Sequence, residues 1–503
     1  MTLTAHHIAE PLLEFASGQK VEHPQDGLFL YGPVDSIDRP SVIRVGVIGT
    51  TVGIKLVHKW LPQLIGRIPV RDPDKLHTAS WPGFEAAFGA KLVTSPVAEI
   101  AIPASSIDTA IRKSNRTDAV RATVKLFEDA LAEHLRTEET RPSVWLVVVP
   151  EIIFTYGRPT VGRPKDAIPS TLVSARAAKR ILQEGDLFAE EEAQVYLFAR
   201  NFHHQLKCQL LGTEIVIQVV RETTLDPSLV LDNFGRPKRS VQEPAKIAWN
   251  FSTTLYFKAG AQPWQLADVR PGVCYVGMVF KKDQSPAARG EACCAAQMFL
   301  NSGNGVVFRG ALGPWYSEKS REFHLSRKAA ADLIGQVVQT YERSHGGPPT
   351  ELFIHGRQRF SSEEWEGFQS AVPAETQLVG VRIRSTQDLR LFRPEVDVPV
   401  LRGSAVTVSR REGYLWTTGY TPRLRTYAGF ETPKPIAINI DHGDGDLLTV
   451  MRDVLALTKV NYNSCDFASG LPVTLKFADR VGEILIASPN GAKAPPLPFR
   501  FYI

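Results

Sequence analysis

The sequence predicts an α/β protein with two consecutive parts, a Rossmann-like domain followed by a domain with a mixed sheet of the ribonuclease-H-like kind. Two observations carry this prediction. Apolar strand-like segments alternate with helix-like segments in the first half, and several strands follow one another before the first helix of the second half. The turn-rich stretch 260–272 separates the two patterns. We therefore expect domains at 1–260 and 261–503.

In the first half, strands and helices alternate in the way that is typical of a parallel sheet. The expected strands are β-branched or wholly apolar and cover 41–50, 144–150 and 213–220. The expected helices cover 52–66, 116–136, 190–211 and 241–260. The acidic residues at the start of the 190–211 segment suit the positive end of a helix dipole.

In the second half, the apolar segments 273–280, 293–301 and 306–310 are expected to be successive strands. A helix at about 325–344 and a strand at 351–356 follow, and further strands lead to a helix at 445–460. The last expected strands are PVTLKFA (472–478) and GEILIA (482–487). Successive strands before the first helix indicate a mixed sheet.

Composition excludes several classes of protein but selects none. With 43% hydrophobic and 22% charged residues, the chain is globular, and its net charge of +5 is weak evidence for nucleic-acid binding. The five scattered cysteines match neither zinc spacing nor a disulfide framework. The N-terminus has no secretory signal pattern, and no apolar segment is long enough for a membrane span. We expect a reduced, cytoplasmic protein.

Four polar residues in the first half could converge on one phosphate group. His203 and Lys207 are four residues apart on an expected helix, so they share one helical face. Gln218 interrupts the apolar strand IVIQVV, and Lys246 lies near the start of the next helix. Charged and neutral donors of this kind bind phosphate together. Taken singly, each residue could equally be a surface charge or a satisfied buried amide.

The runs FHHQLKCQLLGTEIVIQVVRETT and AKIAWNFSTTLYFKAGAQPWQL resemble the MID domain of prokaryotic Argonautes. The end of the chain, from LTKVNYNSCDFASGLPVTLKFADRVGEI to PPLPFRFYI, resembles the close of a PIWI domain. The resemblance implies that His203, Lys207, Gln218 and Lys246 bind the 5′ phosphate of a guide. It also implies that Gln218 and the C-terminal carboxylate of Ile503 hold Mg²⁺ or Mn²⁺ at the guide 5′ end.

At 503 residues, the chain resembles a short prokaryotic Argonaute, which has MID and PIWI domains but no N or PAZ domain. Such proteins resemble the sensor half of a two-protein immune system. The resemblance implies a 5′-phosphorylated guide RNA, a single-stranded DNA target and a partner with an APAZ region. The partner would carry an effector, which is a TIR or sirtuin-like NAD-consuming enzyme or a nuclease, and oligomerisation would often accompany its activation.

An active PIWI domain needs a tetrad of carboxylates that holds two metal ions. The motifs of the family place Val279 (in YVGMVF), Arg357 (in FIHGRQRF) and Asn461 at tetrad positions. Valine cannot ligate a metal, and arginine would repel one. We therefore expect no catalytic activity in this chain, with the enzymatic activity residing in the partner.

A single window of the second half concentrates arginine. Residues 376–430 contain nine arginines, no lysine and four acidic residues. Arginine forks suit phosphate contacts, so we expect some of these residues to line a channel for the guide–target duplex. The candidates for backbone contacts are Arg382, Arg384, Arg410, Arg411, Arg423 and Arg425. Strands also often carry solvated arginines on one face, which is the alternative interpretation.

Two other functions compete with a guide-directed sensor. One is an active guide-directed endonuclease, which the missing carboxylates oppose. The other is a nucleotide- or protein-binding module that uses the Rossmann-like half without nucleic acid.

Overall fold

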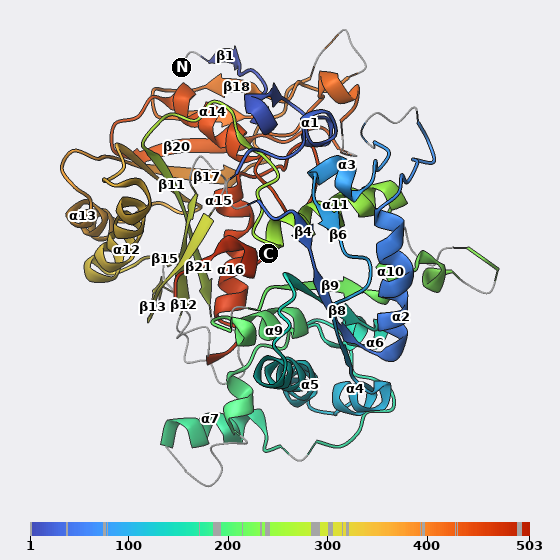
Figure 1. Ribbon diagram of the computed structural model, residues 1–503. Helices are drawn as coiled ribbons and strands as arrows, with labels where there is room; N and C mark the ends of the chain where they lie inside the picture. The colour runs from blue at the N-terminus through green and yellow to red at the C-terminus, as the bar shows by residue number, and fades with distance from the viewer. Residues whose placement is uncertain are drawn as a thin grey trace.

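The computed structural model contains two main sheets, one in each half of the chain (Figure 1). The structure describes residues 3–36, 39–73, 77, 79–170, 172–184, 193–213, 215–231, 234–236, 242–282, 292–299, 305–313, 315–317, 321–392, 394, 398–427, 429, 431–489 and 495–503. The expected α/β fold class is confirmed, with a parallel sheet in the first half and a mixed sheet in the second.

The first half is built on four parallel strands in the order β7-β5-β8-β9. These strands are β5 (Val45–Gly49), β7 (Ala98–Ala101), β8 (Val144–Val149) and β9 (Ile217–Arg221). All six residues of β8 are buried, as expected for a parallel strand that is covered on both faces. A separate pair, β4 (Val42–Ile43) and β6 (Lys91–Leu92), is also parallel.

Helices connect these strands close to where the sequence places them. The helices of the first half are α2 (Thr51–Trp60), α3 (Phe84–Phe88), α4 (Ala104–Ile111), α5 (Arg116–Thr137), α6 (Glu151–Tyr156), α7 (Ala175–Glu184), α9 (Phe202–Leu210), α10 (Glu222–Leu225) and α11 (Pro244–Lys258).

The expected helix at 190–211 is shorter than predicted. Helix α9 begins at Phe202, because the side chain of Asn201 accepts a hydrogen bond from the backbone N–H of His204 and caps the helix. Part of the predicted segment, 190–192, lies outside the described residues, and a short 3-10 turn covers Val195–Leu197.

The second half is built on a ten-stranded mixed sheet in the order β1-β18-β19-β20-β17-β16-β11-β12-β13-β21. Its strands are β1 (Thr4–His7), β11 (Val273–Lys282), β12 (Ala292–Phe299), β13 (Gly305–Gly313), β16 (Glu351–Gly356), β17 (Gln377–Ser385), β18 (Ser404–Thr407), β19 (Glu412–Leu415), β20 (Ile436–His442) and β21 (Leu497–Pro498). Strands β11, β12 and β13 pair antiparallel, whereas β16 pairs parallel with both β11 and β17. The three successive strands predicted before the first helix are thus confirmed.

Helices cover both faces of this sheet. They are α12 (Arg327–His345), α13 (Ser362–Ala371), α14 (Leu447–Leu457), α15 (Val473–Lys476) and α16 (Ala478–Leu485). A small hairpin, β14 (Tyr316–Ser317) and β15 (Glu322–Phe323), precedes α12.

The strands predicted at 472–478 and 482–487 are wrong, because this segment forms α15 and α16. Alternating apolar residues at 473, 475 and 477 suggested a strand. The buried residues Ala478, Val481 and Leu485 instead recur at helical spacing, and they pack α16 against the sheet. Tertiary packing therefore decided that this segment is helical.

The first residues of the chain belong to the second sheet. Strand β1 pairs with β18, and β2 (Leu13–Glu14) joins β3 (Lys20–Val21) and β10 (Gln265–Leu266) in a small sheet. Helix α1 (Pro24–Tyr31) follows. The division at residue 260 stays a prediction, but this pairing ties residues before α1 to the second half.

A buried ion triad fixes the same segment. The carboxylate of Glu10 accepts from the guanidinium of Arg402 at 2.8 Å and from the ammonium of Lys459 at 2.8 Å. Burial alone would raise the pKa of the Glu10 carboxyl, but the two cations outweigh it and hold the pKa below its ordinary value. Arg402 and Lys459 are themselves buried, so Glu10 is their counter-charge.

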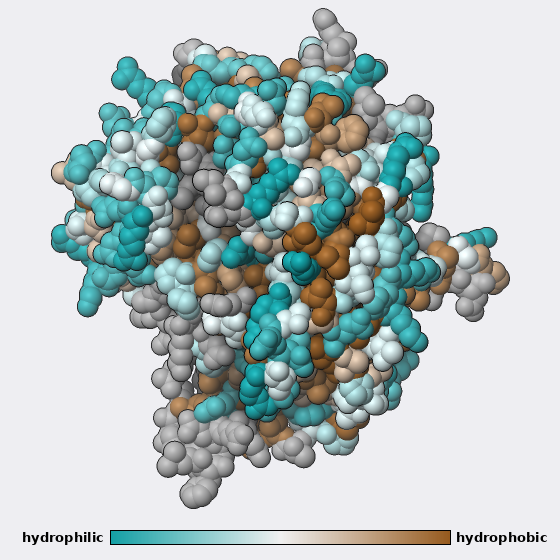
Figure 2. Space-filling model, in the orientation of Figure 1, coloured by the Kyte–Doolittle hydropathy of each residue, from teal (hydrophilic) through white to brown (hydrophobic). Residues whose placement is uncertain are grey.

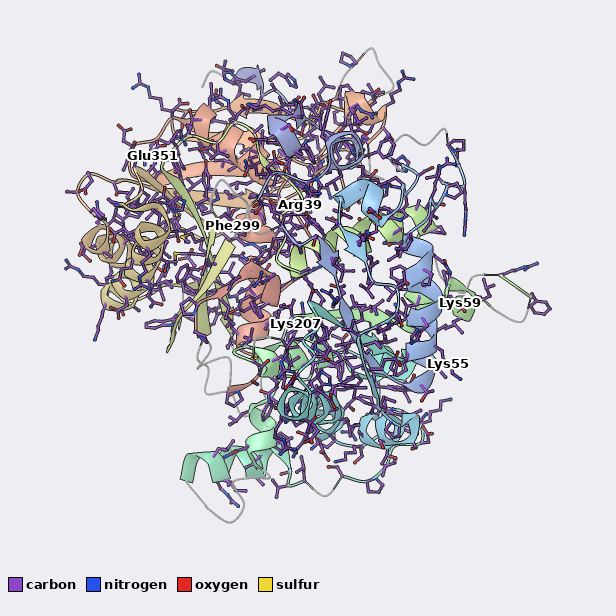
Figure 3. All side chains as sticks on the ribbon, in the orientation of Figure 1. Arg39, Lys55, Lys59, Lys207, Phe299 and Glu351 are labelled. Atoms are coloured by element: carbon purple, nitrogen blue, oxygen red, sulfur yellow. The ribbon has the colours of Figure 1, made fainter. Side chains whose placement is uncertain are left out.

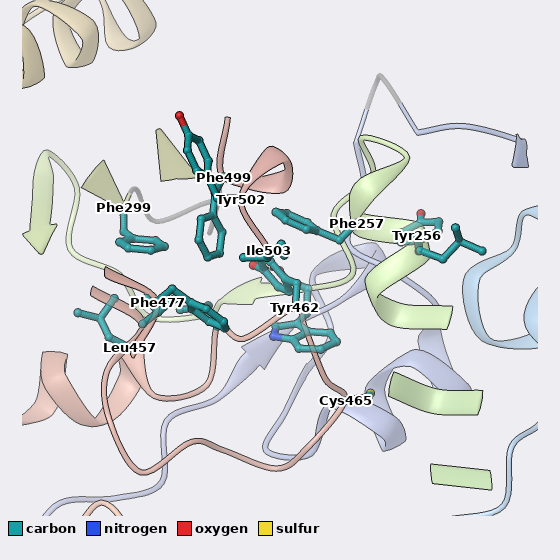
Figure 4. Packing of buried hydrophobic residues seen from close by; sticks show 14 of the residues in the cluster. Tyr256, Phe257, Phe299, Leu457, Tyr462, Cys465, Phe477, Phe499, Tyr502 and Ile503 are labelled. Atoms are coloured by element: carbon teal, nitrogen blue, oxygen red, sulfur yellow. Dashed lines mark hydrogen bonds between the residues drawn. The ribbon is translucent and has the colours of Figure 1, made fainter. Parts of the chain in front are cut away.

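One hydrophobic core joins the two halves, with α11 between them. Nearly every residue of α11 is buried, and Phe257 packs on Tyr462 with ring centroids 4.7 Å apart. Figure 4 shows Phe257, Tyr462, Phe477 and Phe499 gathered around the last residues of the chain. The C-terminus therefore lies at the centre of the molecule, as Figure 1 also shows.

Hydrophobic residues also reach the surface. Figure 2 shows them gathered in the middle of one face, while its edges are mostly hydrophilic. Within the described ranges, no helix has the length and apolar character that a membrane crossing needs.

We expect Glu10→Gln to lower the free energy of unfolding by about 3–5 kcal/mol, because it leaves two buried cations without their carboxylate. Urea unfolding measures this loss. The matched control is Asp268→Asn, which breaks an exposed pair with Lys20 and should leave the free energy of unfolding nearly unchanged. Equal losses in the two variants would contradict the assignment of the triad.

Candidate functional site

A cavity of about 500 Å³ lies where the two halves meet, at the carboxyl ends of β8 and β9. Ligands of parallel α/β sheets bind at this edge. The start of α9 and the end of α11 line the cavity from the first half, while α16 and the last residues of the chain line it from the second. An anion here would lie near the positive end of the α9 dipole.

Lys207 lines this cavity from α9 and is only 3% exposed. Its ammonium donates to the main-chain oxygen of Tyr502 at 3.0 Å and to that of Ile503. Figure 3 shows Lys207 near the centre of the molecule. Burial, followed by the charge of Arg480, lowers the pKa of Lys207 to about 7. A bound anion would favour the charged ammonium.

Gln218 and Lys258 form the opposite wall. Lys258, the last residue of α11, is 2% exposed and donates to the carbonyl oxygen of Ile217 at 2.8 Å and to Oε1 of Gln218 at 2.7 Å. Burial, followed by the charge of Lys207, lowers the pKa of Lys258 well below its ordinary value. Two buried ammonium groups therefore line one cavity.

His203 also lines the cavity, with its ring open to it. Desolvation by the surrounding protein, followed by the charge of Lys207, lowers the pKa of this imidazole well below its usual value. His203 is therefore a neutral hydrogen-bonding group at pH 7 when no ligand is bound.

The structure brings His203, Lys207, Gln218 and Ile503 together as predicted, but it does not bring Lys246 to them. Lys246 lies twelve residues before Lys258 on α11, which is about 18 Å along a helix. Its ammonium pairs with Asp466 at 3.2 Å. Lys258, and not Lys246, lines the cavity in the structure, so the assignment of Lys246 to the phosphate stays a prediction.

The sequence carried a signal for Lys258 that spacing alone did not reveal. It ends the run FSTTLYFK, in which every residue is buried, and a lysine inside such a helix must have a buried partner. The contribution of Arg480 could not be found in this way, because residue 480 was expected to lie in the link between two strands.

The charge of the cavity is one-sided. Five of its side chains are cationic, namely Arg158, Lys207, Arg221, Lys258 and Arg480. Among the described residues that line it, none is an aspartate or glutamate. The ring of Phe154 adds an aromatic wall, with the guanidinium carbons of Arg221 and Arg158 at 3.4 and 4.1 Å from its centroid. The arrangement suits a phosphate with an attached planar group.

The oxygen donors at this site fit a magnesium ion only in part. The described residues include no group of three His, Cys, Asp or Glu side chains that could hold a metal. Oε1 of Gln218 and the end of the chain at Ile503 offer oxygens at the cavity. Mg²⁺ is commonly held by one or two carboxylates together with substrate phosphates and water, so this donor set would suffice only with a bound phosphate.

A second cavity, of about 180 Å³, lies in the second half and brings together Val279, Arg357 and Asp479. The guanidinium of Arg357 pairs with Asp479 at 2.7 Å, and the ammonium of Lys281 pairs with the same carboxylate at 3.1 Å. Val279 offers no ligand atom. This cavity therefore does not fit a pair of divalent metal ions.

Asn461 does not line this second cavity, which corrects its predicted position beside Val279 and Arg357. Its side-chain amide donates to Oγ of Ser464 at 2.8 Å within a turn. Asp479 faces the other two residues instead, because α16 carries it to the carboxyl end of β16.

The candidate arginines of the window 376–430 have different surroundings in the structure. Arg382 and Arg411 line a hollow of about 410 Å³ next to the second cavity. Arg410 lines another hollow, which shares Arg411 with the first and lies beside β1 and the start of α14. Arg423 instead binds Asp26 of α1 at 2.6 Å, and Arg425 occupies a left-handed turn with a φ of +50°. Arg384 lies exposed on β17.

Arg382 also has an ion-pair partner, Asp441, at 3.5 Å. The structure therefore leaves Arg384, Arg410 and Arg411 as candidates for backbone contacts. Arg423 and Arg402 already have partners within the protein, because Arg423 pairs with Asp26 and the buried guanidinium of Arg402 pairs with Glu10. Arg393, another arginine of the window, lies outside the described residues.

No family model and no curated protein matches this sequence. Solved structures of Argonaute proteins do match its fold. The Clostridium butyricum Argonaute bound to a guide DNA and a 19-mer target DNA has a TM-score of 0.62 at 14% identity over 100% of this chain. The A. aeolicus Argonaute gives 0.55 at 15% over 98%, and Drosophila Piwi gives 0.58 at 12% over 99%.

The chain therefore has an Argonaute-like α/β fold, with a Rossmann-like part followed by a ribonuclease-H-like part. It covers 55%, 54% and 56% of those three chains, respectively, so it spans about half of their length.

We expect Lys258→Met to weaken binding of a 5′-phosphorylated oligonucleotide by about 10- to 100-fold, because one charge-assisted hydrogen bond is lost. Lys246→Met, on the same helix, should leave binding unchanged. Fluorescence anisotropy with 5′-phosphorylated and 5′-hydroxyl forms of one RNA measures both. A larger effect of Lys246→Met, with both variants folded, would restore the original assignment.

Proposed function

We propose that this chain binds the 5′ phosphate of a guide RNA in the cavity between its two halves and presents the guide to single-stranded DNA. The observation that carries the proposal is the cavity itself, with two buried ammonium groups and three further cationic side chains but no acidic side chain in its described lining. Such a site favours a dianion, and its size leaves room for a nucleotide next to the phosphate.

In this proposal, each side chain has a distinct part in binding. Lys207 and Lys258 supply charge to the phosphate, while His203 and Gln218 supply neutral hydrogen bonds. The Gln218 oxygen and the Ile503 carboxylate would hold Mg²⁺ or Mn²⁺, which would offset the charge between phosphate and carboxylate. Base pairing with the guide would select the target, and phosphate contacts would add salt-dependent affinity.

The most direct test is to purify the chain from cells of its source and to sequence the nucleic acid that comes with it. We expect short RNA with 5′ phosphates, because a phosphate dianion would complement the excess of cationic side chains in the cavity. Competition in vitro should show a preference of at least about tenfold for 5′-phosphorylated over 5′-hydroxyl RNA. Purified protein without bound RNA and without this preference would refute the proposal.

We also propose that the chain does not cleave its target. The support is the second cavity, where Val279 and Arg357 face Asp479 and the carboxylate pairs with two cations. We expect no cleavage of a matched DNA target by the guide-loaded chain in Mg²⁺ or Mn²⁺. Denaturing gel electrophoresis of end-labelled target measures this, and guide-dependent products would favour the endonuclease alternative.

Activity would then reside in a partner. We propose a heterodimer with an APAZ-containing effector, which is a TIR or sirtuin-like NADase or a nuclease, activated against plasmids and phages when target DNA pairs. Reading the neighbouring open reading frame tests this proposal directly.

A further inference from the structure

The second cavity contains cations where a nuclease of this fold would need metal ligands. Arg357 and Lys281 both pair with Asp479, and Lys281 also pairs with Glu483 at 3.2 Å. A divalent cation would have to displace two positive side chains from one carboxylate to bind here. The ion pairs of Asp479 with Arg357 and Lys281 therefore disfavour metal binding in this cavity.

These ion pairs leave donors free for an anion. A guanidinium has five N–H donors, and the Arg357 pair with Asp479 uses Nη2. The Arg357 side chain is 45% exposed, so its remaining donors are accessible. Arg359 lines the same cavity and also the neighbouring hollow that holds Arg382 and Arg411. Arginine forks of this kind match the oxygens of a phosphodiester.

Helix α16 places this cavity next to the 5′-phosphate cavity. Asp479 lines the second cavity, whereas the following residue, Arg480, lines the first. Glu483, one turn later, pairs with Lys281 of β11 and, at 3.6 Å, with His204 of α9. The two cavities thus lie on two sides of one short helix, and a strand held by its 5′ end in the first cavity passes close to the second.

We propose that the second cavity is a metal-independent binding site for a phosphodiester of the bound nucleic acid. Arg357 and Arg359 contact the phosphate, and Asp479 is the intramolecular counter-ion that the phosphate displaces from Arg357. The inference rests on the proposed guide-binding function and adds a second phosphate site to it. It assigns Asp479 to charge balance rather than to metal binding.

The test uses the full chain loaded with a 5′-phosphorylated RNA guide and measures the Kd for a complementary single-stranded DNA, in Mg²⁺ and in EDTA. Arg357→Gln should weaken target binding by about tenfold and reduce the slope of log Kd against log salt by about one. Asp479→Asn should tighten binding by about two- to fivefold, because it removes the competing carboxylate. Both effects should be the same in Mg²⁺ and in EDTA.

The matched control pair is Arg136→Gln and Glu133→Gln, which breaks an exposed ion pair on α5 away from both cavities and should change neither the Kd nor the salt slope. Weaker binding by Asp479→Asn in Mg²⁺ alone would identify Asp479 as a metal ligand and overturn the proposal. Unchanged binding in both cavity variants, with guide loading intact, would also overturn it. Failure of the wild-type chain to load the 5′-phosphorylated guide would instead refute the proposed function.

Discussion

The contact between the buried Lys207 ammonium and the main-chain oxygens of Tyr502 and Ile503 is the interaction on which the rest of the site depends. It joins a helix of the first half to the end of the chain, and it does so inside a cavity that supplies no acidic side chain among its described residues. Burial, followed by the charge of Arg480, lowers the pKa of Lys207 to about 7 even beside the end of the chain. An anionic ligand in this cavity would favour the charged ammonium.

The two cavities solve the electrostatic problem in opposite ways. The first gathers Lys207, Lys258 and three arginines, against which stand only the chain-terminal carboxylate at Lys207 and Glu151 at Arg221, so cations are in excess. The second neutralises Arg357 and Lys281 with Asp479, so it is balanced before any ligand arrives. Because α16 carries Asp479 to one cavity and Arg480 to the other, small movements of this helix would be felt at both.

The organisation of the fold was largely predictable, because buried strands and helices have apolar residues at characteristic spacings in the sequence. The all-apolar β8 and the successive strands β11, β12 and β13 were recognised from those spacings. The segment of α15 and α16 was misread, since a short apolar run permits either period until its packing is known. Asp479 and Arg480 fell in the expected link between the two predicted strands, whereas the structure places them on α16, where they line two different cavities.

Periodicity in the sequence predicted the fold class and strands such as β5, β8, β11, β12 and β16, because burial follows residue type and local spacing. The family resemblance named His203, Lys207, Gln218 and Ile503, which the structure places at the first cavity. The tertiary structure alone decided that Lys258 rather than Lys246 completes this cavity, and that Asp479 rather than Asn461 faces Val279 and Arg357. The physical reason is that convergence depends on which end of a helix reaches a given point. Twelve residues along α11 separate two lysines by about 18 Å, a distance that spacing in the sequence cannot assign to a site.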